Sequence, residues 1–64
     1  MKRVDLERTI RRRARRLGLD VEFVEGASHT RVFVGGKQST IPPHREIKER
    51  LAVTFLRQLG LEDT

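Results

Sequence analysis

The stretch LDVEFVEGASHTRVFVGGKQSTI, residues 19–41, decides the fold, because apolar and polar side chains alternate along three short runs separated by glycine-containing turns. Alternation with a period of two is typical of half-buried β-strands. The pattern predicts three strands, over residues 19–24, 28–34 and 37–41, and two-residue turns at Gly26-Ala27 and Gly35-Gly36. The Gly-Gly turn is expected to have positive φ at both positions.

These turns also set the strand registers. The second turn pairs Val32 with Ser39, and the first pairs Val21 with Val32. Both hairpins then place one apolar set on the same face of the sheet: Leu19, Val21, Phe23, Val32, Val34 and Ile41. The agreement supports both registers, because a slip of one residue would scatter the set over two faces.

The other face is predicted to be polar. It carries Glu22 opposite Arg31 as a cross-strand ion pair, and His29 beside Val24 and Pro42. We therefore expect His29 to lie off the core, at the edge of this open face.

A helix is predicted before the meander, over residues 5–17, with Asp5 as its N-cap and Gly18 as its terminator. After the sheet, a turn containing Pro42-Pro43 and His44 should lead into a second helix that ends before Gly60. The apolar stripes are Leu6, Ile10, Ala14 and Leu17 in the first helix, and Ile47, Leu51, Ala52, Phe55, Leu56 and Leu59 in the second. We predict an α+β fold of order α-β-β-β-α, with both helices packed on one face of a three-stranded antiparallel sheet.

Composition limits what the chain can do. Sixty-four residues allow one domain, residues 1–64, with a small core. The lack of cysteine excludes disulfides and thiolate metal sites. No apolar run is long enough for a membrane span or a signal-peptide core, so we expect a cytoplasmic protein. The net charge of +5 comes mostly from arginine, which favours a polyanionic partner.

A histidine beside a phosphate-attracting surface is the minimum equipment for cleaving RNA, because imidazole exchanges protons near neutral pH. Taken alone, His29 would be interpreted as a solvated surface histidine, but the surrounding pattern favours a catalytic role. His44 follows the proline turn, where it either supports the reaction or satisfies backbone groups near the second helix.

The predicted RNA contacts are cationic side chains of the first helix and the sheet: Arg8, Arg11, Arg12, Arg15, Arg31 and Lys37. They would hold phosphates without reading sequence. The alternative for the helix arginines is a solvated face. Phe33, on the outer face, either stacks a base or covers a gap.

Four stretches carry a family resemblance: Gly26-Ala27-Ser28-His29, Ile41-Pro42-Pro43-His44-Arg45-Glu46-Ile47, Leu51-Ala52 and Leu56-Arg57-Gln58-Leu59-Gly60-Leu61. On these four stretches the chain resembles, over almost its whole length, the HicA family of bacterial type II toxins. Members of this family are small RNA-cleaving proteins with a double-stranded-RNA-binding-domain-like fold. The resemblance implies that His29 is the residue required for cleavage, with Ser28 beside it in a supporting role. The chain departs from the family pattern at Ala27, a common glycine, at Thr30, often a second histidine, and at Lys48, often Asn or Gly.

The resemblance further implies a toxin that cleaves mRNA and is neutralised by a cognate HicB-like antitoxin. RNA supplies its own nucleophile, the 2′-hydroxyl, so His29 would move a proton and Arg31 would stabilise charge at the phosphate. We expect RNA and the antitoxin as partners, and no metal, small-molecule cofactor or membrane. Two alternatives stay open: a non-catalytic RNA-binding module of the same fold, and an interaction protein whose basic surface pairs with an acidic partner.

Overall fold

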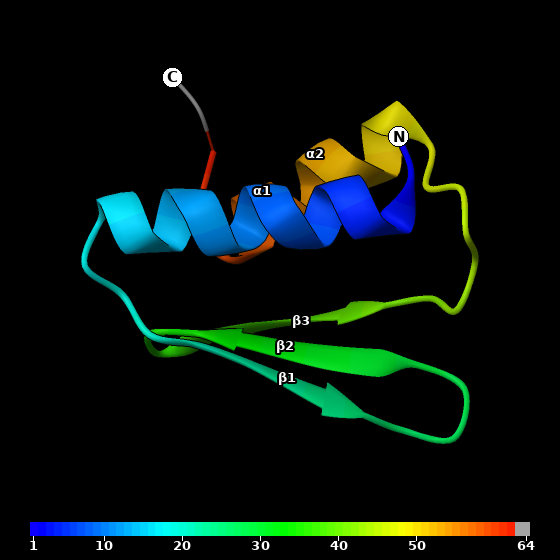
Figure 1. The fold of residues 1–64 in the computed structure, drawn as a ribbon, viewed down its shortest axis with the longest axis horizontal. Helices are drawn as coiled ribbons and strands as arrows, with labels where there is room; N and C mark the ends of the chain where they lie inside the picture. Colours follow the sequence, from blue (N-terminus) through cyan, green and yellow to red (C-terminus); the bar gives the residue numbers. More distant parts are fainter. Residues whose placement is uncertain (63–64) are drawn as a thin grey trace.

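The elements follow the predicted order in the computed structural model, which describes residues 1–62 (Figure 1). They are α1 (Arg3–Arg16), β1 (Val21–Glu25), β2 (Thr30–Val34), β3 (Lys37–Ile41) and α2 (Glu49–Gln58). The strands form one antiparallel sheet with β2 in the centre.

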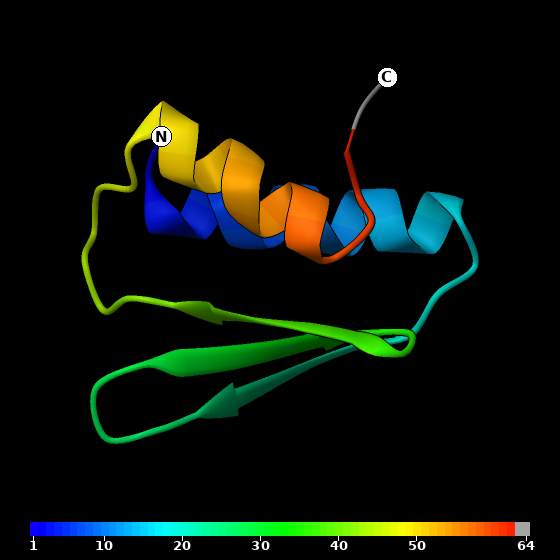
Figure 2. The same ribbon diagram turned by 180° about the vertical axis from the view of Figure 1, so that it is seen from behind.

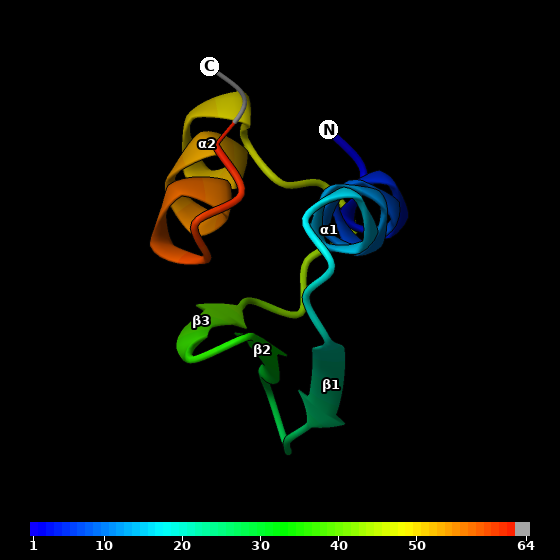
Figure 3. The same ribbon diagram turned by 90° about the vertical axis from the view of Figure 1, so that its left-hand side faces the viewer.

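Both helices cover the same face of the sheet and leave the other face open, with α1 above β1 and α2 above β3 (Figure 3). The core lies between these two layers, and its buried apolar side chains are Leu6, Ile10, Ala14, Val32, Val34, Ile41, Ile47, Ala52, Phe55, Leu56, Leu59 and Leu61. The predicted α-β-β-β-α fold is therefore confirmed.

The helix ends differ from the predicted ones at the start of α1. That helix begins at Arg3, so Asp5 lies in its first turn and is not the N-cap. Two residues of the predicted helix stripes are exposed: Leu17 by 58%, because it follows the last turn of α1, and Leu51 by 43%, because the buried stripe of α2 runs through Ala52 instead. The chain leaves both helices at the predicted glycines, with Gly18 at φ 71°.

The hairpin of β2 and β3 has the predicted register, with Val32 opposite Ser39. Its turn differs in one respect, because only Gly35 has positive φ, as in a type II′ turn.

The hairpin of β1 and β2 is shifted by two residues. Phe23 pairs with Val32, and four residues, Gly26–His29, form the loop. A shift of two keeps every side chain on its predicted face, since the pleat repeats every two residues. The predicted pair of Glu22 with Arg31 is nevertheless wrong, because Glu22 lies opposite Phe33.

The shifted hairpin leaves residues at both of its ends outside the strands. Leu19 precedes β1 and is 39% exposed. His29 lies in the loop, so its predicted pairing with Pro42 does not form.

The beginning of the chain is joined to the connection between β3 and α2. Lys2 forms a backbone bridge with Glu46, and the amide of Arg3 donates to the carbonyl of Arg45 at 2.7 Å. The start of α1, the β1–β2 loop and the β3–α2 connection consequently lie at the same end of the molecule, as Figures 1 and 2 show from opposite sides.

Candidate functional site

The loop that carries His29 is closed by its own backbone. The amide of Gly26 donates to the carbonyl oxygen of His29 at 2.8 Å. A Cβ at position 26 would lie only 2.8 Å from that same oxygen, so a larger residue would force the loop open. This loop geometry therefore depends on glycine at position 26.

The His29 ring is exposed and is held by its neighbour. Its Nδ1 atom lies 3.1 Å from the hydroxyl oxygen of Ser28, which can donate or accept. Among the described residues Nε2 has no partner. The contact with Ser28 therefore engages Nδ1 and leaves Nε2 unpaired among the described residues.

Arg31 shares a surface hollow with His29. This hollow, of about 340 Å³, is lined by Gly26, Ala27, Ser28, His29, Arg31 and Thr40. The structure therefore brings together the predicted acid–base group, its supporting serine and one predicted phosphate contact. A histidine and an arginine in one open hollow can accommodate a phosphodiester, with proton transfer and charge stabilisation on adjacent groups.

A network under the loop involves Arg3, which the sequence analysis did not select. Its guanidinium donates to the hydroxyl of Thr30, and that hydroxyl donates to Glu25 at 3.0 Å. The Nε of Arg3 lies within ion-pair range of Glu7, at 3.4 Å, although it makes no hydrogen bond within residues 1–62. Because Glu25 and Thr30 are the residues immediately before and after the loop, Arg3 fixes both stems.

The sequence around Arg3 contains no pattern that predicts this role. Arg3 lies two residues before the predicted start of the helix and 27 positions before Thr30 in the sequence. The contact arises from tertiary packing of α1 over β1.

The open sheet face carries Arg31 above the ring of Phe33, with 5.5 Å between the guanidinium carbon and the ring centroid. Arg31 also donates to the side chain of Gln38 at 3.3 Å. Phe33 is half-buried and lies beside Arg31. The flat aromatic ring and the flat, positively charged guanidinium together form a surface next to the His29 hollow. Such a surface suits unpaired bases.

The predicted contacts on α1 are exposed but spread out: Arg8, Arg11, Arg12 and Arg15. Arg11 lies over the Phe23 ring, with its guanidinium carbon 4.4 Å from the centroid. Arg11 and Arg15 line a separate hollow of about 410 Å³ near the C-terminal end of α1. Because α1 rises about 1.5 Å per residue, Arg15 is about 18 Å along the helix from Arg3 and the His29 loop.

Lys37 does not join the site. It pairs with Val34, four residues along β2 from Thr30, or about 13 Å at the usual strand rise. Its side chain lies on the helix side of the sheet, near Gly60.

His44 is also separate from His29. It lines another hollow, of about 580 Å³, between the start of α1 and the β3–α2 connection. The two histidines therefore do not face one another across a single hollow.

Within residues 1–62 no three His, Asp or Glu side chains come together as ligands for a metal ion. No helix in the described part of the chain has the length and apolar character to cross a membrane.

Comparison with curated proteins finds a relative of this chain. A segment of 43 residues is 44% identical to the probable mRNA interferase HicA 2 of Photorhabdus laumondii subsp. laumondii, over 64% of this chain and 74% of that protein. No protein-family model matches the sequence. No solved structure matches either.

Proposed function

The chain belongs to the HicA family of mRNA interferases, and from this membership we propose that it is the toxin of a type II toxin–antitoxin system, an endoribonuclease that cleaves mRNA. In this proposal residues 1–64 act as one RNA-cleaving domain in the cytoplasm. A cognate HicB-like antitoxin neutralises it.

One observation carries the proposal: His29 is exposed on a loop braced from below, with Arg31 in the same hollow. The contact with Ser28 orients the ring and leaves Nε2 to meet the substrate.

In the proposed reaction the 2′-hydroxyl oxygen of the RNA attacks the adjacent phosphorus, and the bond from phosphorus to the 5′ oxygen breaks. His29 either accepts the proton of the 2′-hydroxyl or donates a proton to the leaving 5′ oxygen, and water handles the other proton. Arg31 stabilises the charge on the phosphoryl oxygens. The products are a 2′,3′-cyclic phosphate and a 5′-hydroxyl end.

The test compares wild type, His29→Ala and His29→Gln on a long mRNA in EDTA. Glutamine can hydrogen-bond but cannot exchange a proton at neutral pH, so both variants should cleave about 10²-fold more slowly or worse, while His29→Gln keeps its affinity for RNA. Because the side chain is exposed, His29→Ala should change the free energy of unfolding by no more than about 0.5 kcal/mol.

Equal cleavage by wild type and both variants would contradict the role of His29. Wild type that binds RNA without cutting it would favour the non-catalytic module. Loss of cleavage in EDTA with rescue by magnesium would contradict a metal-free mechanism. Where cleavage is seen, its pH dependence between about pH 5 and 8 assigns the role, because activity that rises with pH requires a base and activity that falls requires an acid.

A further inference from the structure

A second hollow has no part in the reaction above. It has a volume of about 580 Å³, and its walls come from Lys2, from the first two turns of α1 and from residues 43–46. We propose that this hollow binds a nucleotide of the RNA that flanks the cleaved phosphate, with the base against Pro43 and His44 and the phosphate held by Lys2 and Arg45. The proposal deepens the proposed function and rests on it.

The hollow and the His29 site are built by segments at the same end of the molecule. Arg3 lines the hollow, and the same guanidinium reaches Thr30, which stands between His29 and Arg31 in the chain. On the other side, Thr40 lines the His29 hollow and Pro43 lines the larger one. Three residues span at most about 11 Å, so one RNA strand can occupy both hollows.

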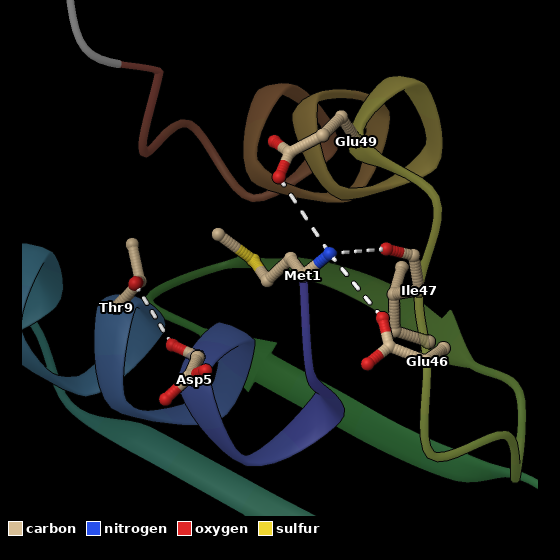
Figure 4. Close-up of polar contacts among 6 residues, drawn as sticks. All are labelled: Met1, Asp5, Thr9, Glu46, Ile47 and Glu49. Atoms are coloured by element: carbon tan, nitrogen blue, oxygen red, sulfur yellow. Dashed lines mark hydrogen bonds and ion pairs between the residues drawn. The ribbon is translucent and has the colours of Figure 1, made fainter.

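The charge of the hollow favours a phosphate. Its two acidic residues are engaged, since Glu7 is 3.4 Å from Arg3 and Glu46 is 3.6 Å from the amino group of Met1. Figure 4 shows the carboxylate of Glu46 turned toward Met1. Within the described residues the side chains of Lys2 and Arg45 have no such partner and are exposed. They are the cations left for an anionic ligand.

The apolar part of the wall favours a base. Val4 is 51% exposed at this hollow, and Pro43 and His44 are exposed on the opposite wall. Single-stranded RNA is recognised largely by stacking unpaired bases on planar side chains such as histidine. A protein partner could use the same apolar surface, but the position of this hollow at the same end of the molecule as the His29 hollow favours the substrate.

Steady-state cleavage of two RNAs by wild type, His44→Ala and Arg45→Gln tests the proposal. One RNA is a dinucleotide that contains only the cleaved phosphate, and the other is an octanucleotide around a site mapped with wild type. Stacking of one base on a planar side chain raises affinity roughly fivefold to hundredfold. His44→Ala should therefore raise KM for the octanucleotide by the same factor. The value of kcat and the KM for the dinucleotide should change by less than about twofold.

The matched control is Arg50→Gln, which removes an exposed cation of α2 outside the hollow. It should leave both KM values unchanged. Thermal unfolding of each variant establishes that the fold is kept. If KM for the octanucleotide is the same in His44→Ala, Arg45→Gln and wild type, the subsite does not exist.

A second readout separates this proposal from the proposed function. If wild type cuts no RNA, the proposed function fails, and equilibrium binding of a single-stranded octaribonucleotide still tests the hollow. Weaker binding by His44→Ala and Arg45→Gln than by Arg50→Gln supports the subsite, and equal binding overturns it. Variants that lose only antitoxin binding, with RNA affinity unchanged, would overturn it in favour of a protein interface.

Discussion

Replacing Arg3 with Met tests the brace under the His29 loop. Methionine keeps an apolar stem of similar length, so the main loss is the charge-assisted hydrogen bond to Thr30, which is 1% exposed. Hydrogen bonds to charged groups contribute about 1.5–3 kcal/mol. The ion pairs with Glu7 and Glu25 add little, at most about 1 kcal/mol, since Glu25 is 75% exposed. We expect Arg3→Met to lower the free energy of unfolding by about 1.5–3 kcal/mol.

For a domain of this size each kcal/mol shifts Tm by about 4–8 °C, so Tm should fall by at least about 6 °C. Arg12→Met is the matched control, because Arg12 is exposed on the same helix, and it should stay within about 0.5 kcal/mol of wild type. Urea denaturation of Arg3→Met, Thr30→Val and the double variant measures the coupling free energy between the two side chains, which we expect to exceed about 0.5 kcal/mol. Additive effects, or an Arg3→Met variant as stable as Arg12→Met, would refute the brace.

Two further predictions concern the loop and the basic helix. Gly26→Ala should slow RNA cleavage and lower Tm, because the added Cβ would lie 2.8 Å from the carbonyl oxygen of His29. The control is Gly36→Ala, which should change neither, because no atom lies within 4 Å of a Cβ at that position. Equal effects of the two substitutions would contradict this account of the loop. Replacing Arg12 and Arg15 with Gln should make the slope of log RNA affinity against log salt concentration shallower, by about 0.7 for each single-strand phosphate that these arginines neutralise. An unchanged slope in a binding titration would show that the two arginines belong to a solvated face.

The residues of the candidate site were predictable to different degrees. His29, Ser28 and Arg31 were selected from residue chemistry and from the family resemblance, and they line one hollow. Lys37 and His44 were selected by chemistry alone, and the fold places the first at the far hairpin end and the second in another hollow. Residue type does not predict which end of a strand meets which loop.

The sequence by itself determined the order of the elements and the faces of the sheet. A period of two assigns each side chain to a face, and an error of two residues leaves that assignment intact, which is why Val21, Phe23 and Val32 face the helices although the first register was wrong. The length of the β1–β2 loop was not determined in this way, because the same apolar pattern fits loops of two and four residues.

Tertiary structure decided the loop and the site. The backbone bond from Gly26 to His29 closes a four-residue loop, and Arg3 joins both of its stems from another element. The bridge between Lys2 and Glu46 brings the start of the chain beside the β3–α2 connection and so builds the hollow around His44. The contacts of Arg3 and Lys2 join residues far apart in the sequence, and local propensity and periodicity do not encode them because they depend on how α1 packs over the sheet.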